Sequence, residues 1–452
     1  MTGRDPGAAE LGTSRDVPAF PRRLWRALDR HPPPGALAIG RRWRSPLRGP
    51  WLTSVFGLVL LIGLPIVIIT GLLDYAAYAP QFGQALPRDV GWLRPPPFEW
   101  PTRPAWLFRV SQGLHVILGI VLVPVVLAKL WSVIPKLFAW PPVRSTAQLL
   151  ERLSLLLLVG GILFQIATGL LNVQYAYLFG FDFYTAHYFG GWVFIAAFVA
   201  HVALKLPRMI SALRSRPFLA EFRRGPDDTR PEPPDPDDLV APRPGPATVS
   251  RRGALTLVGG LSLLLGGLTV GQTMDGPLRR TALLMPRGRQ PGTGPNGFPV
   301  NRSAAAAGVT QERTGPGWRL TLAAAGRTVT LDRQQLLALP QHTATLPIAC
   351  VEGWSTLQTW TGVRLRDLAA IAGAGEPASA LVRSLERAGL FNQAQLQSNQ
   401  ILDPDSLLAL KVNGVDLALD HGYPARVIVP ALPGVHCTKW VATIDFRTTA
   451  GG

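Results

Sequence analysis

The side chains best suited to redox chemistry in this 452-residue chain are a small set of thiols and imidazoles. Cys350 lies in the segment IACVEGWS, between an apolar run and a glycine–tryptophan turn, and Cys437 is the other cysteine. Three interpretations of Cys350 compete: a packed thiol, half of a disulfide with Cys437, or a metal ligand or nucleophile. His115, His187 and His201 lie in apolar stretches, where an imidazole is costly and typically functional.

The spacing of the histidines suits haem ligation. Fourteen positions separate His187 from His201, which on one helix is about 21 Å of rise and about 40° short of four turns. These two imidazoles should therefore point to nearly the same side at opposite faces of a membrane. His115 enters its stretch from the same face as His187, so the two can bind one b-type haem between them. The position fourteen after His115 is Lys129, so a second haem at His201 would need an unidentified ligand. The alternative for each histidine is a hydrogen-bonded structural role.

Four stretches with few or no charges must position these histidines. They are residues 51–73, 110–128, 153–173 and 187–206, and each reaches the roughly 20 residues that a helix needs to cross a membrane. A shorter, glycine-rich stretch at 253–271 follows Ser250-Arg251-Arg252, which suits either a twin-arginine export signal or a positively charged anchor. We expect an all-α bundle of four transmembrane helices, with the fifth span as an anchor.

The formal net charge of +17 is mostly arginine beside the apolar stretches, a signal of membrane topology that does not favour nucleic-acid binding. Arginine-rich segments include the basic tail at 1–50 and the linker at 211–252, which we expect to be cytoplasmic. Residues 174–186 carry no lysine or arginine and should face the other side. The fifth span then leads outward, through a linker at 272–295, to a domain at 296–452 outside the cytoplasm.

The C-terminal residues follow a different pattern from the apolar stretches. The segment TGPGWRLTLAAAGRTVTLDRQQLLAL predicts two short strands around a glycine turn and then a short helix. HGYPARVIVP and KWVATIDF predict further strands. Residues 296–452 should therefore form an α+β, strand-rich domain of ordinary size.

Two resemblances follow from these motifs. Residues 51–210, with the H-x13-H spacing and the helix order, resemble a membrane cytochrome b domain of the bacterial cytochrome b561-like type. The combination of C-V-E-G-W-S, W-x-G-V-x-L and H-G-Y-P-x-R-x-x-V-P resembles the sulfite oxidase-like molybdopterin domain, most closely the catalytic subunit of periplasmic methionine-sulfoxide reductase. That resemblance implies that the Cys350 thiolate binds molybdenum, whose charge would itself lower the pKa of the thiol.

The same resemblance implies a set of residues that hold the pterin. The N-G-F-P-V-N segment should wrap the pterin, a hydroxyl should approach it from V-R-S, a polar pair should contact it from H-G-Y-P-A-R, and H-C-T-K-W should hold its phosphate. These expected cofactor-binding residues are Asn296, Pro299, Val300, Asn301, Ser384, His421, Arg426, Cys437, Thr438 and Lys439.

The expected function is that of a multi-pass membrane oxidoreductase. Quinol would reduce haem b (one haem, and a second only if His201 finds a partner), and an outer Mo-molybdopterin centre would take oxygen from a sulfoxide-like substrate, small or protein-bound. The expected partners are therefore membrane lipid, quinone or quinol and that substrate, with no nucleic acid. Two alternatives remain open: sulfite-type oxidation that passes electrons to quinone, and a non-enzymatic haem-binding membrane protein.

Overall fold

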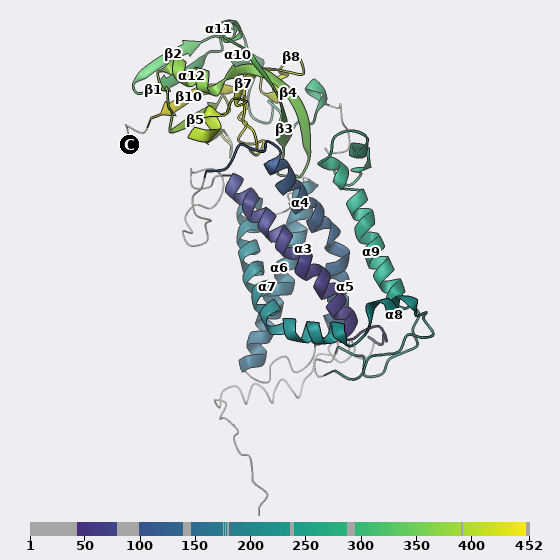
Figure 1. Cartoon of the computed structure of the whole chain (residues 1–452). Coiled ribbons are helices and arrows are strands. Elements are labelled where there is room, and N and C mark those ends of the chain that lie inside the picture. The colour runs from purple at the N-terminus through teal and green to yellow at the C-terminus, as the bar shows by residue number, and fades with distance from the viewer. Residues whose placement is uncertain are drawn as a thin grey trace, which may run out of the picture.

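The computed structural model describes residues 43–78, 99–138, 146–174, 176, 178, 180–235, 239–286, 294–389 and 392–448. Most of the predicted basic tail and part of the linker predicted at 272–295 lie outside the described residues. The described chain forms a helical region followed by a strand-rich domain that sits at one end of the helices (Figure 1).

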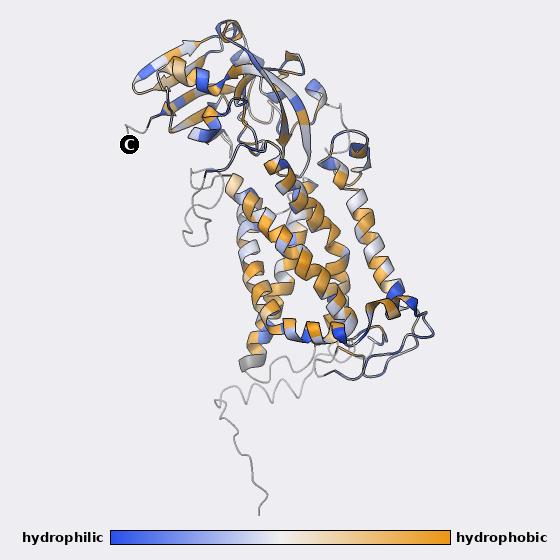
Figure 2. Cartoon of the chain, in the orientation of Figure 1, coloured by the Kyte–Doolittle hydropathy of each residue, from blue (hydrophilic) through white to orange (hydrophobic). Residues whose placement is uncertain are grey.

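The helical region contains five helices, among the described residues, that are long and apolar enough to cross a membrane. They are Pro50–Ala77, Leu107–Leu137, Leu149–Val173, Phe183–Arg214 and Arg251–Gln272. The five predicted stretches are thus confirmed, and each helix extends beyond its predicted apolar core. Large apolar side chains remain exposed along them, among them Leu156 at 67% and Leu263 at 79%, and the helices consist mostly of hydrophobic residues (Figure 2). Such surfaces are suited to lipid.

Local sequence explains where these helices begin. α3 (Pro50–Ala77) has proline in its first turn, where a missing N–H costs nothing. α7 (Phe183–Arg214) is capped by the Asp182 carboxylate, which accepts from the Thr185 amide at 2.8 Å, and α9 (Arg251–Gly267) is capped by Ser250. Asp and Ser are favoured at this position because they satisfy a free amide.

The second span was predicted to end at residue 128, and this boundary is wrong. α4 (Leu107–Val121) passes at Leu122 into α5 (Val123–Leu137), and the two count as one span of 31 residues. The helix continues because the residues after Lys129, LWSVIPKL, are again largely apolar. Lys129 therefore lies inside the span and not in the following loop.

The helices pack in an order that places α9 at the side. α3 packs against α4, α5 and α7, α6 (Thr146–Val173) packs against α7, and α9 packs against α4 and α5, as Figure 1 shows. Leu64, Leu122 and Phe194 form an apolar cluster at the centre of the bundle.

The linker predicted at 211–252 packs against the end of the bundle that lies away from the strands. The short helix α8 (Phe218–Arg223) brings the buried Glu221 into ion pairs with Arg216, Arg224 and Arg251. Glu232 accepts from the Trp51 amide at 3.0 Å, at the start of α3. The pairing gives Arg251 a structural role.

The C-terminal domain is built on two sheets. One has the order β2-β1-β10-β5-β6 and the other β3-β4-β7-β8, with β9 paired to β7. The strands are β1 (Leu320–Ala324), β2 (Arg327–Leu331), β3 (His342–Ala349), β4 (Ser355–Arg364), β5 (Ser379–Ser384), β6 (Gln393–Gln397), β7 (Leu407–Val412), β8 (Val415–Asp416), β9 (Arg426–Ile428) and β10 (Val441–Arg447). The helices are α10 (Gln311–Thr314), α11 (Arg333–Ala338), α12 (Leu365–Ala372) and α13 (Ser398–Leu402), with 3-10 turns η3 (Val270–Gln272), η4 (Pro277–Thr281), η5 (Pro295–Gly297) and η6 (Leu419–His421). The predicted strand–turn–strand–helix at 314–339 and the two later strands are confirmed.

Candidate functional site

Cys350 lies in the turn of the β3–β4 hairpin, which we call the thiol loop (residues 350–354). The Cys350 amide donates to the Trp354 carbonyl and the Gly353 amide donates to the Cys350 carbonyl, both at 2.9 Å. Gly353 has φ of 94°, a left-handed conformation that favours glycine. Cys350 is buried, and both cysteines are free, so the structure contains no disulfide between Cys350 and Cys437.

The thiol is surrounded by several of the predicted cofactor residues. The thiol pocket is lined by Phe298, Pro299, Asn301, Ile348, Ala349, Cys350, Trp354, His421, Arg426 and Gly434. The space enclosed among these side chains is about 10 Å³, because the Phe298 ring stacks on His421 with centroids 3.7 Å apart. A pterin ring at this place would have to displace the Phe298 side chain.

Other predicted residues support the thiol pocket from a distance. The Asn296 side chain donates to the Asp416 carbonyl and accepts a hydrogen bond from the Ala418 backbone N–H. The Ser384 hydroxyl donates to the Lys439 carbonyl at 2.8 Å. The lining of the thiol pocket does not include these two residues, and it does not include Val300, Cys437, Thr438 or Lys439.

The polar groups behind the pocket suit an anionic ligand. Arg426 is 1% exposed and donates to the carbonyls of Cys437 and His421, and it forms no ion pair with a carboxylate among the described residues. Burial lowers the pKa of Arg426 to about 10, so the guanidinium stays charged. The Thr438 hydroxyl is buried without a hydrogen-bond partner. A buried cation and an orphaned donor are costly unless an anion binds them, so the donor set fits a pterin phosphate.

The ionisable side chains around Arg426 are uncharged or packed against other groups. Burial, with the nearby Arg426 charge, lowers the pKa of His421 to about 3. Lys439 donates to the carbonyls of Arg302 and Asp420 at 2.8 Å each, and burial lowers its pKa well below the ordinary value. Cys437 packs in an apolar cluster with Phe298 and others, and burial raises the pKa of its thiol. Its side chain is therefore a packing group.

Comparison with known proteins identifies this domain. Residues 307–451 match the family model described as "Oxidoreductase molybdopterin binding domain". The C-terminal domain is a molybdopterin-binding oxidoreductase domain. The match begins after Asn296, Pro299, Val300 and Asn301, so it does not bear on those four residues.

The similar proteins are of the sulfite oxidase-like kind. The uncharacterized oxidoreductase YuiH of Bacillus subtilis (strain 168) is 35% identical over 117 residues, which are 26% of this chain and 58% of that protein. Mitochondrial sulfite oxidase of Mus musculus is 29% identical over 149 residues, 27% of each chain. The sulfane dehydrogenase SoxCD of Paracoccus pantotrophus is 24% identical over 29% of this chain and 38% of that one, with a TM-score of 0.27 that adds nothing to the assignment. The chain thus spans 58% and 27% of the length of these two curated relatives.

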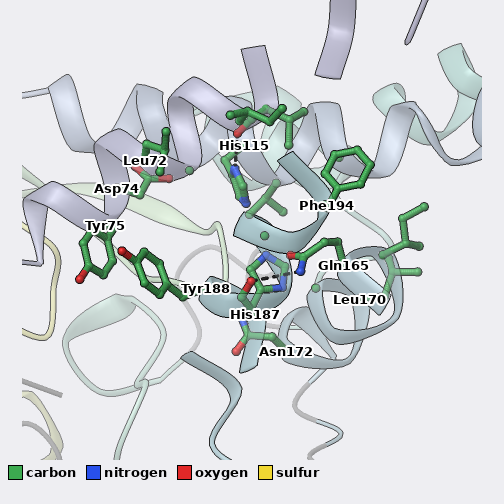
Figure 3. Close-up of a pocket in the computed structure, with 18 of the residues that line it drawn as sticks. Leu72, Asp74, Tyr75, His115, Gln165, Leu170, Asn172, His187, Tyr188 and Phe194 are labelled. Carbon is green, nitrogen blue, oxygen red and sulfur yellow. Dashed lines mark hydrogen bonds between the residues drawn. The ribbon is translucent and has the colours of Figure 1, made fainter. Parts of the chain in front are cut away.

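Beneath the molybdopterin domain, the helices bring His115 and His187 together, as predicted. Their ring centroids are 6.2 Å apart with the rings at 80°, inside a pocket that we call the histidine pocket (Figure 3). His115 Nδ1 lies 2.9 Å from the Val67 carbonyl, which can only accept, so Nδ1 carries the proton. His187 Nδ1 lies 2.9 Å from the Thr168 hydroxyl, which itself has the Phe164 carbonyl as an acceptor at 2.7 Å. Both Nε2 atoms are therefore available as ligands, oriented by their partners.

The distance between the two rings fits one shared iron. A ring-centroid separation of 6.2 Å is close enough for both imidazoles to reach one metal ion. Among the described residues, no group of three His, Cys, Asp or Glu side chains is placed to hold a bare metal ion. A haem takes only its axial ligands from the protein, and imidazole is one of the side chains that serve in that role.

The histidine pocket has several glycines in its lining. Its volume is about 250 Å³, and its lining includes Gly71, Gly119, Gly169 and Gly191. A Cβ at Gly71 would lie 2.8 Å from the His115 ring, and none would meet an atom within 4 Å at Gly119 or Gly191. Glycine at these positions leaves space beside the imidazoles.

His201, the candidate second haem ligand, lines a separate cavity of about 560 Å³ near the other end of the bundle. Lys129 also lines it and donates to the Thr53 carbonyl at 2.7 Å. No second imidazole is among the described residues that line this cavity. The two cavities share Leu64, Val126, Ile162 and Phe194 in their walls, so one layer of apolar side chains separates them.

The molybdopterin domain touches the histidine pocket through the thiol loop. Val351, next to Cys350, lines the histidine pocket, and the Gln112 side-chain amide donates to the Val351 carbonyl at 2.8 Å. Gln112 lies almost one helical turn before His115. The sequence interpretation missed both Gln112 and Thr168, although each is a polar residue in an apolar span, which is a signal of function.

Proposed function

We propose that the protein is a membrane-bound oxidoreductase that takes electrons from quinol through haem b and reduces a sulfoxide-like substrate at a molybdopterin centre. The observation that carries the proposal is that the two sites adjoin along the chain: Val351 follows Cys350, which lines the thiol pocket, and itself lines the pocket of His115 and His187. An electron source and an oxygen-transfer site need such closeness, because electron transfer weakens steeply with distance.

Each residue group has a defined part in this proposal. The Cys350 thiolate ligates molybdenum, Arg426 and Thr438 hold the pterin phosphate, and the Nε2 atoms of His115 and His187 ligate haem iron. When bound, haem b carries single electrons and the molybdenum cofactor transfers an oxygen atom. Quinol loses two electrons and two protons, and the sulfoxide gains two of each and leaves as sulfide and water. The single unpaired histidine of the inner cavity favours one haem.

The proposed location follows from the arginine pattern. Arginines of the described linker, among them Arg216, Arg224 and Arg251, lie at the end of the helices away from the strands. The positive-inside tendency supports a cytoplasmic position for that end. The molybdopterin domain would then face the outside of the cell membrane, and the substrate would reach it from there.

A second direction of electron flow is favoured by one relative. Mitochondrial sulfite oxidase of Mus musculus is similar over the molybdopterin domain, so oxidation of sulfite with transfer of electrons to quinone is the second candidate. The same protein parts would serve, with electrons leaving through the histidine pocket.

Redox spectroscopy of purified, detergent-solubilised protein tests the proposal. The haem absorption should appear at about one haem per chain, be reduced by a short-chain quinol, and be reoxidised on addition of a sulfoxide. Reduction of the haem by sulfite with no response to sulfoxides would select the second candidate. Protein without haem or without molybdenum would refute both.

A further inference from the structure

The thiol loop is held by three donors from the helical region. The carbonyls of Val351, Gly353 and Ser355, which alternate along the loop and the first residue of β4, accept hydrogen bonds from outside the molybdopterin domain. Their donors are the Gln112 amide at 2.8 Å, the Thr273 hydroxyl at 3.3 Å and the Arg279 guanidinium. Ser355 also directs its hydroxyl to the Thr273 carbonyl at 3.4 Å.

Two of these donors lie in the segment that follows the fifth span. After α9 the chain passes through η3, and residues 273–279 then fold under the thiol loop and enter η4. A Cβ at Gly271 would lie 2.0 Å from the Leu278 carbonyl oxygen, so the tight fold of this segment requires glycine there. The segment is thus a built contact and not a loose connection.

The segment is fastened in turn to α4, the helix that carries His115. Arg109 donates from Nε to the Thr273 carbonyl at 2.9 Å and forms an ion pair with Asp275 at 2.6 Å. Asp275 pairs with Arg279 at 2.9 Å, and Arg279 is only 3% exposed. A continuous chain of contacts therefore runs from α4 through Asp275 and Arg279 to the backbone beside Cys350.

We propose that residues 273–279, together with Arg109, form a coupling clamp that sets the position of the thiol loop over the histidine pocket. Arg109, Asp275 and Arg279 are positioning residues for electron transfer, and the fifth span serves as part of this clamp as well as an anchor. The clamp itself is independent of the cofactors, and its effect on electron transfer rests on the proposed function.

The test compares Arg279→Gln with Arg279→Lys and with Arg280→Gln, all in the full-length, cofactor-loaded protein. Arg280 is the exposed neighbour of Arg279 and serves as the matched control. Three quantities are measured: amide hydrogen exchange of the thiol loop, reoxidation of reduced haem by substrate, and substrate reduction driven by a soluble low-potential dye that bypasses haem.

We expect Arg279→Gln to speed hydrogen exchange in the loop and to slow haem reoxidation several-fold, because electron transfer weakens steeply with distance. Dye-driven turnover should stay within about twofold. Arg279→Lys, which keeps the charge and one donor, should recover part of the rate, and Arg280→Gln should match the wild type.

The outcomes separate the clamp from the proposed function. Unchanged hydrogen exchange and haem reoxidation in Arg279→Gln overturn the clamp. An equal loss of dye-driven and haem-driven turnover also overturns it, because Arg279 would then support the molybdenum site itself. Failure of wild-type haem to be reoxidised by substrate refutes the proposed function, while faster exchange in Arg279→Gln alone would still support the structural part of the clamp.

Discussion

Replacing Thr168 by valine tests how the histidine pocket prepares its ligands. The hydroxyl lies 2.9 Å from His187 Nδ1, and valine has nearly the same shape without the oxygen. The imidazole N–H would then be buried without an acceptor, which costs about 1–3 kcal/mol. That range corresponds to the roughly tenfold to hundredfold loss of metal affinity that follows removal of such partners.

The chain offers a closely matched control for this change. Thr269, just after α9, donates to the carbonyls of Leu265 and Gly266 at 2.7 and 3.2 Å. Thr168 donates in the same way to the carbonyls of Phe164 and Gln165 at 2.7 and 3.3 Å. Both threonines are buried, and of the two only Thr168 contacts a histidine. Thr269→Val therefore removes a buried hydroxyl with the same pair of backbone acceptors but without an imidazole partner.

The assay is the rate at which haem passes from each variant to an excess of an apo-globin acceptor. We expect Thr168→Val to lose haem about ten to a hundred times faster than Thr269→Val, with unchanged helix content. Equal rates of haem loss in the two variants would show that His187 is not oriented by Thr168, or that it does not bind haem.

Three further predictions concern single side chains. Cys350→Ser should keep haem but abolish substrate turnover, whereas Cys437→Ser should retain most activity because its thiol only packs; normal turnover in the Cys350 variant would remove this residue as the ligand. His201→Phe should leave the ratio of haem to protein unchanged in a pyridine haemochrome titration, and a halved ratio would establish a second haem. Burial holds the pKa of His436 at about 4, against an ordinary value of 6.5, so the unfolded chain binds more protons between these values. The contribution of neutral His436 to the free energy of unfolding is therefore complete above pH 6.5. It falls as the pH drops toward 4, and about 2 kcal/mol is lost at pH 5. His436→Gln should reduce the pH dependence of the stability of the molybdopterin domain between pH 7 and 5, measured by thermal unfolding, and an unchanged slope would contradict this.

Local properties of the sequence were enough to predict the helices and several strands. The length and composition of an apolar run decide whether a helix can span a membrane, so the five spans were found although their ends were not. Alternate spans run in the same direction, so His115 and His187, each near the start of its span, were expected at the same depth, and the two rings do lie together. The end of the second span was misplaced at Lys129, because one charge inside an apolar run does not terminate a helix whose neighbours remain apolar.

The motif around Cys350 was sufficient to identify the molybdopterin domain, and part of its pocket followed from the motif. Pro299, Asn301, His421 and Arg426 do surround the thiol. Asn296 does not, because its amide binds the backbone of residues 416 and 418. A motif gives the order of residues along the chain but not which of them points inward.

The junction between the two parts of the chain was decided by the tertiary structure alone. Gln112 and Val351 are 239 positions apart, and Arg109 reaches Asp275 across 166. No periodicity or residue spacing in the sequence predicts such contacts, because they depend on how the molybdopterin domain packs against the end of the helices. The sequence by itself therefore determined that a thiol and two imidazoles were present with suitable neighbours. Only the folded chain placed the thiol loop on the wall of the histidine pocket, where long-range packing brings together groups that local chemistry cannot connect.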